Sequence, residues 1–186
     1  MTARGSGGLK SEAGAQALGG HAEPSVSPPV NEGTPARLAE VVEEFAELPR
    51  ELRLEALLDY SRRVPPLPSA LAGNRDAMEQ VHECQTPFFV ASKVAEDGAV
   101  TLWFDAPPEA PTTRGFAGIL AVGLNGASVE EVLAVPDGFY AEMGLHEVIS
   151  PLRLRGIGAI LARVKRQLRA QAAARGDGGP AATTPS

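Results

Sequence analysis

Apolar residues recur every three or four positions between residues 34 and 64, which predicts two amphipathic helices. The apolar stripe of the first helix consists of Leu38, Val41, Val42, Phe45 and Leu48. The stripe of the second helix consists of Leu54, Leu57, Leu58 and Ser61. Thr34 and Pro35 stand in the order of an N-cap residue and a first helical residue, and Pro49 is expected to start the second helix. Because the connection is so short, the two helices are expected to pack as a helical hairpin.

After residue 87 the pattern changes from helical spacing to alternation. The apolar face of this pattern contains Phe88, Val90, Val94, Val100, Leu102 and Phe104. Asp97 and Gly98 separate the two alternating runs and form a dipeptide typical of a tight hairpin turn. The sequence therefore predicts an antiparallel β-hairpin. It predicts a loop over residues 64–80 with a helical turn near 77–80, and leaves the position of a third strand open.

Helical signals return in the last 75 residues or so. Thr112 or Thr113 is expected to cap a third helix, which ends at Asn125-Gly126 and is apolar enough to be buried against the sheet. A capping box at residues 128–131 predicts a short fourth helix, and residues 138–143 predict a further helical turn.

Ser150 and Pro151 are expected to open the last helix. Its buried stripe is predicted to consist of Ile157, Ile160, Leu161, Val164 and Leu168. Its solvent side is predicted to consist of Arg163, Lys165, Arg166 and Arg169. The predicted fold class is α+β, with a small antiparallel β-sheet packed against helices.

The chain has 186 residues, which fits one domain. Residues 1–33 and 175–186 are rich in small and polar residues and are predicted to be disordered tails around a folded unit of residues 34–174. The N-terminus lacks the apolar core of an export signal, and no stretch approaches the roughly 18 apolar residues that span a bilayer. No membrane contact is expected.

Charge is both acidic overall and unevenly placed along the chain. Lys and Arg number 17 against 23 Asp and Glu, giving a net charge of −6, which argues against general nucleic-acid binding. Residues 38–59 hold seven acids and two bases, whereas residues 150–175 hold seven bases and no acid. Two interpretations stay open: two solvated helix faces, or a bipolar surface that orients a protein partner.

Cys84 is the only cysteine, which excludes an internal disulfide and fits a reducing, cytoplasmic setting. It lies in a polar loop that leads into a strand. Two interpretations are therefore considered: a functional thiol, and a small buried residue. A zinc site with His82 would need carboxylates from far along the chain. A cysteine hydrolase would need His82 or His146 within reach of the thiol, which the sequence does not indicate.

Four short motifs occur in an order and spacing that together resemble the SufE family of sulfur-acceptor proteins, including its CsdE branch. They are Leu-Leu-Asp-Tyr at 57–60 followed by Leu-Pro at 67–68, Val-His-Glu-Cys-Gln-Thr at 81–86, Arg-Gly-Phe-Ala-Gly-Ile-Leu at 114–120 and Ser-Pro-Leu-Arg-Leu-Arg-Gly at 150–156. The resemblance covers about residues 36–172 and implies the fold shared with the IscU (NifU)-type cluster scaffold.

The resemblance implies that Cys84 accepts persulfide sulfur from a pyridoxal-phosphate (PLP) dependent cysteine desulfurase of the SufS or CsdA type. The protein would stimulate that desulfurase and pass the sulfur to an iron–sulfur scaffold, as a transfer partner rather than a free-standing enzyme. No cofactor or metal of its own is expected, since PLP resides in the desulfurase, and the chain is expected to be a monomer or weak homodimer. The alternative is a non-catalytic adaptor that regulates a cysteine desulfurase.

The resemblance also points to two supporting residues, Arg153 and Glu109, and the position of His82 two residues before Cys84 adds a third. Arg153 matches the family's arginine at the start of the last helix and is expected to supply a positive field for the thiol. Glu109 matches an acidic position before the third helix, and His82 could polarise the thiol if the loop curls. An Arg153–Glu109 pair that braces the loop and a direct role on sulfur both stay open.

The family further implies a resting state in which the cysteine loop folds over an apolar pocket. The candidates to line that pocket are Phe88, Phe89, Phe116 and Ile119. Two positions depart from the family pattern: Glu83 replaces a glycine, and Val148 replaces a histidine that is often present. Glu83 is expected to stiffen the loop, because it cannot freely adopt positive φ, and to oppose thiolate formation if it lies close.

Overall fold

A three-stranded antiparallel sheet of order β1-β2-β3 organises the computed structural model, which describes residues 33–176. β2 (Phe89–Val94) and β3 (Val100–Asp105) form the predicted hairpin. Gly98 in its turn has a φ of +88°, a conformation that glycine adopts at little cost. The third strand is β1 (Glu79–Gln80), which pairs antiparallel with β2 and is too short to show a periodicity in the sequence.

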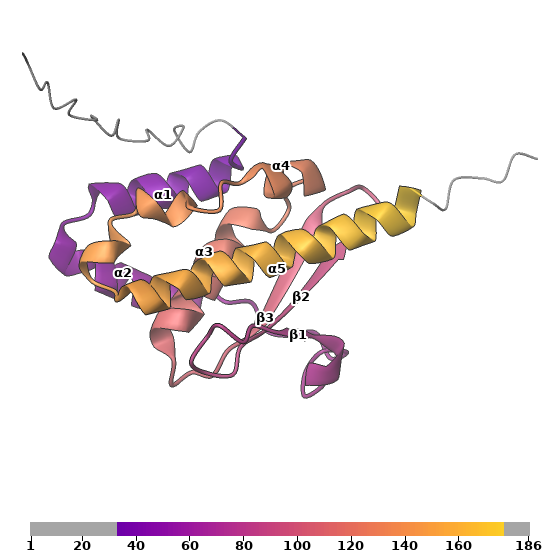
Figure 1. The fold of residues 1–186 in the computed structure, drawn as a ribbon, viewed down its shortest axis with the longest axis horizontal. Helices are drawn as coiled ribbons and strands as arrows, with labels where there is room; N and C mark the ends of the chain where they lie inside the picture. The colour runs from indigo at the N-terminus through magenta and orange to yellow at the C-terminus, as the bar shows by residue number, and fades with distance from the viewer. Residues whose placement is uncertain (1–32, 177–186) are drawn as a thin grey trace, which may run out of the picture.

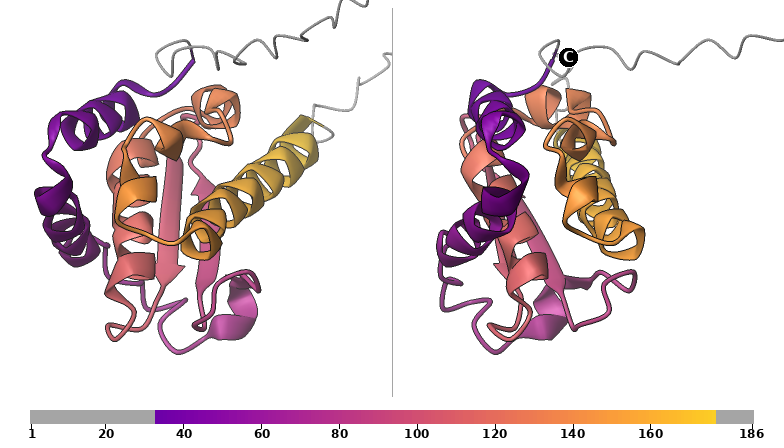
Figure 2. Two further views of the ribbon diagram at one scale, coloured as in Figure 1. Left: turned by 60° about the vertical axis from the view of Figure 1, so that its left-hand side comes forward. Right: turned by 90° about the vertical axis from the view of Figure 1, so that its left-hand side faces the viewer.

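Two helices cover one face of this sheet (Figures 1 and 2). α3 (Pro111–Leu124) packs against β3, and α5 (Pro151–Gly176) crosses β2. The alternate strand residues that the sequence assigns to the apolar face are fully or almost fully buried between sheet and helices. The α+β class expected from the sequence is therefore confirmed.

The N-terminal helices form a further layer over α3. α1 (Ala36–Glu47) and α2 (Arg50–Arg62) make their main contacts with α3 rather than with each other, so the predicted helical hairpin is wrong. The reason is that α3 is buried on almost all sides and offers an apolar surface to both helices. A Cβ atom on Gly118 would collide with the backbone carbonyl of Tyr60, which shows how closely α2 and α3 approach.

The remaining helical segments connect α3 to α5. They are α4 (Val129–Ala134), with the predicted capping box between Ser128 and Glu131, and two 3-10 turns at Phe139–Ala141 and Leu145–Glu147. Another 3-10 turn, Arg75–Ala77, precedes β1 and lies slightly earlier than the turn expected near 77–80.

Several predicted helix starts differ from the structure. Pro35, not Thr34, is the N-cap of α1, and its carbonyl accepts hydrogen bonds from the N–H groups of Leu38 and Ala39. α3 begins at Pro111, so Thr112 and Thr113 lie inside its first turn and cap nothing. Proline is favoured at the first helical position because it lacks an N–H that would otherwise need a partner.

The polar and apolar faces also differ from prediction in α2 and α5. Leu54 is exposed, and Tyr60 takes the buried position on α2. Lys165 is buried, because its ammonium group donates to the carbonyl of Val135 and pairs with Asp137 at 2.7 Å. Arg163 is only 13% exposed, so neither residue lies on a free solvent face.

α5 continues to Gly176, two residues beyond the expected end of the folded unit, and Arg175 donates to the carbonyl of Ala95. The rest of the two predicted tails, residues 1–32 and 177–186, lies outside the described residues. Among the helices between residues 33 and 176, none has both the length and the apolar character required to cross a membrane.

Candidate functional site

Cys84 is carried on a curled loop between β1 and β2. The N–H of Val81 donates to the carbonyl of Phe88 at 2.8 Å and closes the base of the loop. The N–H of Cys84 donates to the carbonyl of Val81 at 3.2 Å and turns the chain toward α5. There the sulfur lies next to Gly156, where an added Cβ atom would be 3.6 Å from Cys84 Sγ, an ordinary contact distance. The thiol is thus half-buried against the first turns of α5.

A cavity of about 280 Å³ opens beside this thiol. Its wall is formed by three segments: the Cys84 loop, the residues around the start of α3, and the first turns of α5. The structure therefore brings together three predicted site residues, Cys84, Glu109 and Arg153, that are far apart in the sequence. His82 does not line the cavity.

Only one of the four aromatic and apolar pocket candidates lines this cavity. Phe116 contributes to its wall, whereas Phe88 and Ile119 are fully buried in the core. Phe89 points to the other side of the sheet, where the guanidinium of Arg75 stacks 4.8 Å from its ring centre. Most of the predicted apolar lining is therefore absent from the cavity, and Glu83, Glu109 and Arg153 contribute charged groups to its wall.

The loop is braced by an ion pair that the sequence analysis missed. Arg163 Nη1 lies 2.8 Å from Glu83 Oε2, and Arg163 Nε lies 3.3 Å from Glu79 Oε1. No ion pair links Arg153 to Glu109 in the part of the chain that the structure describes, so the alternative in which those two brace the loop is not supported. The one sequence signal for the actual brace is the acid at position 83, where the family has glycine.

The closed loop suppresses ionisation of the thiol. Burial raises the pKa of Cys84 to about 11, and the neighbouring Glu83 carboxylate acts in the same direction. The guanidinium of Arg163 offsets part of this pKa increase. The cation that acts on the thiol here is therefore Arg163 rather than Arg153, whereas the expected opposition from Glu83 is observed.

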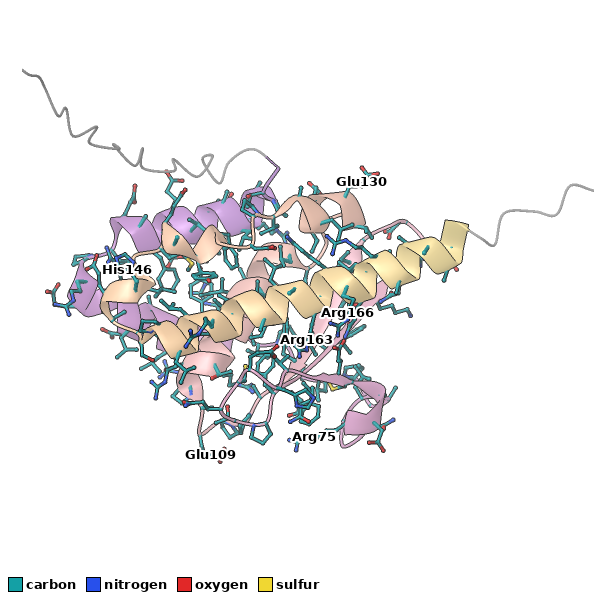
Figure 3. All side chains as sticks on the ribbon, in the orientation of Figure 1. Arg75, Glu109, Glu130, His146, Arg163 and Arg166 are labelled. Atoms are coloured by element: carbon teal, nitrogen blue, oxygen red, sulfur yellow. The ribbon has the colours of Figure 1, made fainter. Side chains whose placement is uncertain are left out.

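The hydrolase and metal interpretations find no further support at this loop. His146 lies in the 3-10 turn before α5, away from Arg163, and does not line the cavity (Figure 3). Between residues 33 and 176 there is no group of three or more His, Cys, Asp or Glu side chains placed to hold a metal ion. Neither described histidine lines the cavity beside the thiol.

Comparison with known proteins identifies the family of the chain. The model of the family SufE, described as an Fe-S metabolism associated domain, matches residues 39–168. The chain belongs to the SufE family. Membership associates it with Fe–S metabolism, and the matched range includes Cys84, Arg114 and Arg153.

Several relatives show how far the similarity extends. Two SufE-like proteins of Mycobacterium tuberculosis, from strains CDC 1551 and H37Rv, are each 53% identical over 135 residues, which cover 73% of this chain and 93% of theirs. SufE-like protein 1, chloroplastic/mitochondrial, of Arabidopsis thaliana is 28% identical over 127 residues, covering 68% of this chain and 33% of its own length. The solution structure of a hypothetical protein from Thermus thermophilus superposes with a TM-score of 0.68 at 48% identity, covering 75% of this chain and 98% of that one.

Proposed function

We propose that this protein is a sulfur acceptor, in which Cys84 takes sulfur from the persulfide of a PLP-dependent cysteine desulfurase and delivers it to iron–sulfur cluster assembly. The observation that carries the proposal is the placement of the chain's single thiol on a curled loop, beside a cavity that Arg153 and Glu109 also border. Membership of the SufE family supplies the context of Fe–S metabolism.

The proposed transfer needs only one thiol. The Cys84 thiolate attacks the outer sulfur of the donor persulfide, a new bond forms between Sγ and that sulfur, and the donor's S–S bond breaks. The electron pair of the broken bond leaves with the donor cysteine as a thiolate, and the proton on the outer sulfur stays with it. The reaction is an exchange that conserves oxidation state, so no external oxidant or reductant is consumed.

The closed loop serves as a resting state in this proposal. With its pKa raised to about 11 by burial, the Cys84 thiol is far less ionised near neutral pH than an unperturbed thiol. Attack on a persulfide therefore requires the loop to leave α5, which removes the burial that raises the pKa. Arg153, which is exposed and lines the same cavity, is then the candidate to stabilise the thiolate.

The test is the intact mass of the protein after incubation with a SufS-type desulfurase, PLP and cysteine. The proposal predicts a gain of one sulfur atom that dithiothreitol removes and that Cys84→Ser abolishes. Far-UV circular dichroism of the serine variant serves as the folding control. An unchanged mass in the presence of a desulfurase that is turning over would refute the proposal.

The second candidate is a non-catalytic adaptor that stimulates a desulfurase without carrying sulfur. It is favoured by the half-buried position and raised pKa of Cys84, which leave the thiol unreactive in the closed loop. An adaptor predicts that Cys84→Ala retains full stimulation of desulfurase turnover. A carrier predicts that stimulation is lost while binding of the variant to the desulfurase persists.

A further inference from the structure

The Cys84 loop is attached to α5 through a small cluster of charged side chains. Two guanidinium groups on one side of that helix, Arg163 and Arg166, meet two carboxylates, Glu79 on β1 and Glu83 on the loop. Arg163 contacts both glutamates, whereas Arg166 contacts only Glu79. Figure 3 shows the two arginines next to each other on α5. Arg163 is therefore the residue that joins the loop to the helix.

Burial differs sharply across the Arg163–Glu83 pair. The Arg163 side chain is 13% exposed and the Glu83 side chain is 51% exposed. The guanidinium is thus held in place by its surroundings, while the carboxylate lies at the surface. When this pair separates, it is Glu83, and with it the loop, that moves.

The base of the loop has its own attachment to α5. Gln167 donates to Glu79 at 3.1 Å and to the carbonyl of Val90 at 3.3 Å, and Arg166 pairs with the same glutamate. These contacts hold β1 and β2 on the helix in addition to the Arg163–Glu79 pair. Glu83 has no such second attachment among the ion pairs and side-chain hydrogen bonds of residues 33–176, so Arg163 provides the one side-chain ion pair that links the tip of the loop to α5, beside the packing of Cys84 against the core.

We propose that Arg163 is a positioning residue for the sulfur acceptor: it holds Glu83 and so keeps Cys84 against α5, and separation of the Glu83–Arg163 pair is the step that frees the thiol. This inference rests on the proposed function for its biological meaning, but the latch itself is a property of the protein alone. Since Glu83 directly precedes Cys84 in the chain, its release moves the sulfur away from Gly156 and into solvent.

A latch and an electrostatic activator predict opposite signs for loss of Arg163. If the guanidinium only favoured the thiolate, its removal would make Cys84 less reactive. If it holds the loop closed, its removal exposes the sulfur and makes Cys84 more reactive. The sign of the change in thiol reactivity therefore decides between the two roles.

The experiment measures the rate of alkylation of Cys84 by iodoacetamide in the full-length protein, without a desulfurase, at pH 8 and low salt. Arg163→Gln is expected to increase the rate about two- to five-fold, which is the shift that loss of one partly exposed ion pair can supply. Arg163→Lys, which can still pair with Glu83, is expected to return the rate to within two-fold of wild type. Arg166→Gln is the matched control, because it removes a cation from the same cluster but leaves the Glu83 pair intact.

Glu83→Gln opens the same pair from its exposed side and keeps the test decisive if Arg163→Gln unfolds. Because this variant also removes an anion that raises the pKa of Cys84, it is read by hydrogen–deuterium exchange of the loop amides of residues 82–86, which does not depend on thiol ionisation. Their exchange is expected to be faster than in wild type, and the double variant is expected to gain less than the product of the two single effects. Sodium chloride at 0.5 M is expected to accelerate alkylation of the wild type and to leave Arg163→Gln unchanged. An unchanged or slower alkylation rate in folded Arg163→Gln, or unchanged exchange of the loop amides in Glu83→Gln, would overturn the latch.

The outcome is separable from that of the sulfur-transfer proposal. Faster alkylation in the variants without any sulfur loading by a desulfurase would leave the latch standing and refute the carrier. Normal sulfur loading with alkylation rates equal to wild type would refute the latch and leave the carrier standing.

Discussion

At the scale of single residues, the ionisation of Cys84 is governed by its burial and by two charged neighbours. The half-buried position and the Glu83 carboxylate favour the neutral thiol, and the Arg163 guanidinium favours the thiolate. Glu83 is itself held ionised, because a hydrogen bond from its own backbone N–H, followed by the interaction with Arg163, lowers its pKa. An anion therefore sits beside the thiol throughout the physiological pH range and keeps the resting protein unreactive.

This environment predicts the pH dependence of thiol reactivity. Because the folded protein favours the neutral thiol, the alkylation rate should keep rising with pH toward an inflection near 11, beyond the value of about 8.5 for a free cysteine. Glu83→Gln removes an anion that raises the pKa, so its inflection should lie lower. The urea-unfolded protein is the control and should inflect near the free value. If the alkylation rate of the folded wild type inflected at the same pH as that of the unfolded chain, the raised pKa of Cys84 would be contradicted.

Arg153 has a different predicted role from Arg163. It does not act on the thiol in the closed loop, yet it borders the cavity that the freed sulfur would cross. Arg153→Gln should therefore leave alkylation of the free protein within two-fold of wild type and slow sulfur loading by a desulfurase about ten-fold, the effect of one pKa unit on the thiolate. Single-turnover loading followed by mass spectrometry measures this rate. Equal loading of variant and wild type would contradict a role for Arg153.

At the scale of elements, the site depends on the close packing of α2 on α3. Two glycines of α3 make this packing possible: a Cβ atom on Gly115 would come within 2.6 Å of the Leu57 side chain, and one on Gly118 would overlap the Tyr60 backbone. Backbone atoms cannot move aside as a flexible side chain can. The start of α3, which borders the Cys84 cavity, is thus positioned by contacts on its opposite side.

Gly118→Ala should therefore destabilise the fold by about 3 kcal/mol, at the upper end of over-packing effects. Gly158→Ala is the matched control, because it also lies within a helix but its Cβ atom would meet Tyr140 only at an ordinary contact distance of 3.6 Å. That substitution should be neutral or stabilising by up to about 1 kcal/mol, since alanine favours helix. Urea denaturation measures both changes, and equal stabilities for the two variants would contradict the packing account.

Some helices and strands could be predicted from the sequence, and others could not. The β2–β3 hairpin and the capping box of α4 were predictable, because each rests on local alternation or on hydrogen bonds between residues three apart. The β1 strand has two residues and no period to detect. The hairpin of α1 and α2 was wrong because their partner, α3, lies more than fifty residues further along the chain. Local patterns do not say which of several apolar surfaces a helix will choose.

At the scale of the whole molecule, the positive charge of α5 is largely engaged by the protein itself. Arg163 pairs with Glu79 and Glu83, Lys165 pairs with Asp137, and Arg175 binds backbone carbonyls. The bipolar surface, one of the two interpretations that the sequence allowed, therefore has less free positive charge than the seven bases of α5 suggest. Its exposed cations include Arg153, Arg155 and Arg169. Two of these three lie at the end of α5 nearest the cavity.

The candidate site was partly predictable at this scale. Cys84, Glu109 and Arg153 were chosen through motifs that resemble the SufE family, and the fold brings them to one cavity. Arg163 was assigned to the solvent side, because helical periodicity shows which residues are apolar but not which charged residue meets a loop from 80 positions earlier. His82 and three of the four pocket candidates lie outside the cavity. The sequence could not show this, because which side chains line a cavity depends on segments that are far apart in the chain.

The central claim is that the sulfur comes to rest on Cys84, and a sulfur mass balance tests it most directly. A desulfurase already loaded with persulfide, freed of cysteine, is mixed with this protein, and both are trapped by alkylation and mapped by peptide mass spectrometry. The account predicts that the desulfurase loses one sulfur atom as the Cys84 peptide gains one, and that Cys84→Ser leaves the sulfur on the donor. Retention of the persulfide by the desulfurase in the presence of folded wild-type protein would contradict the account.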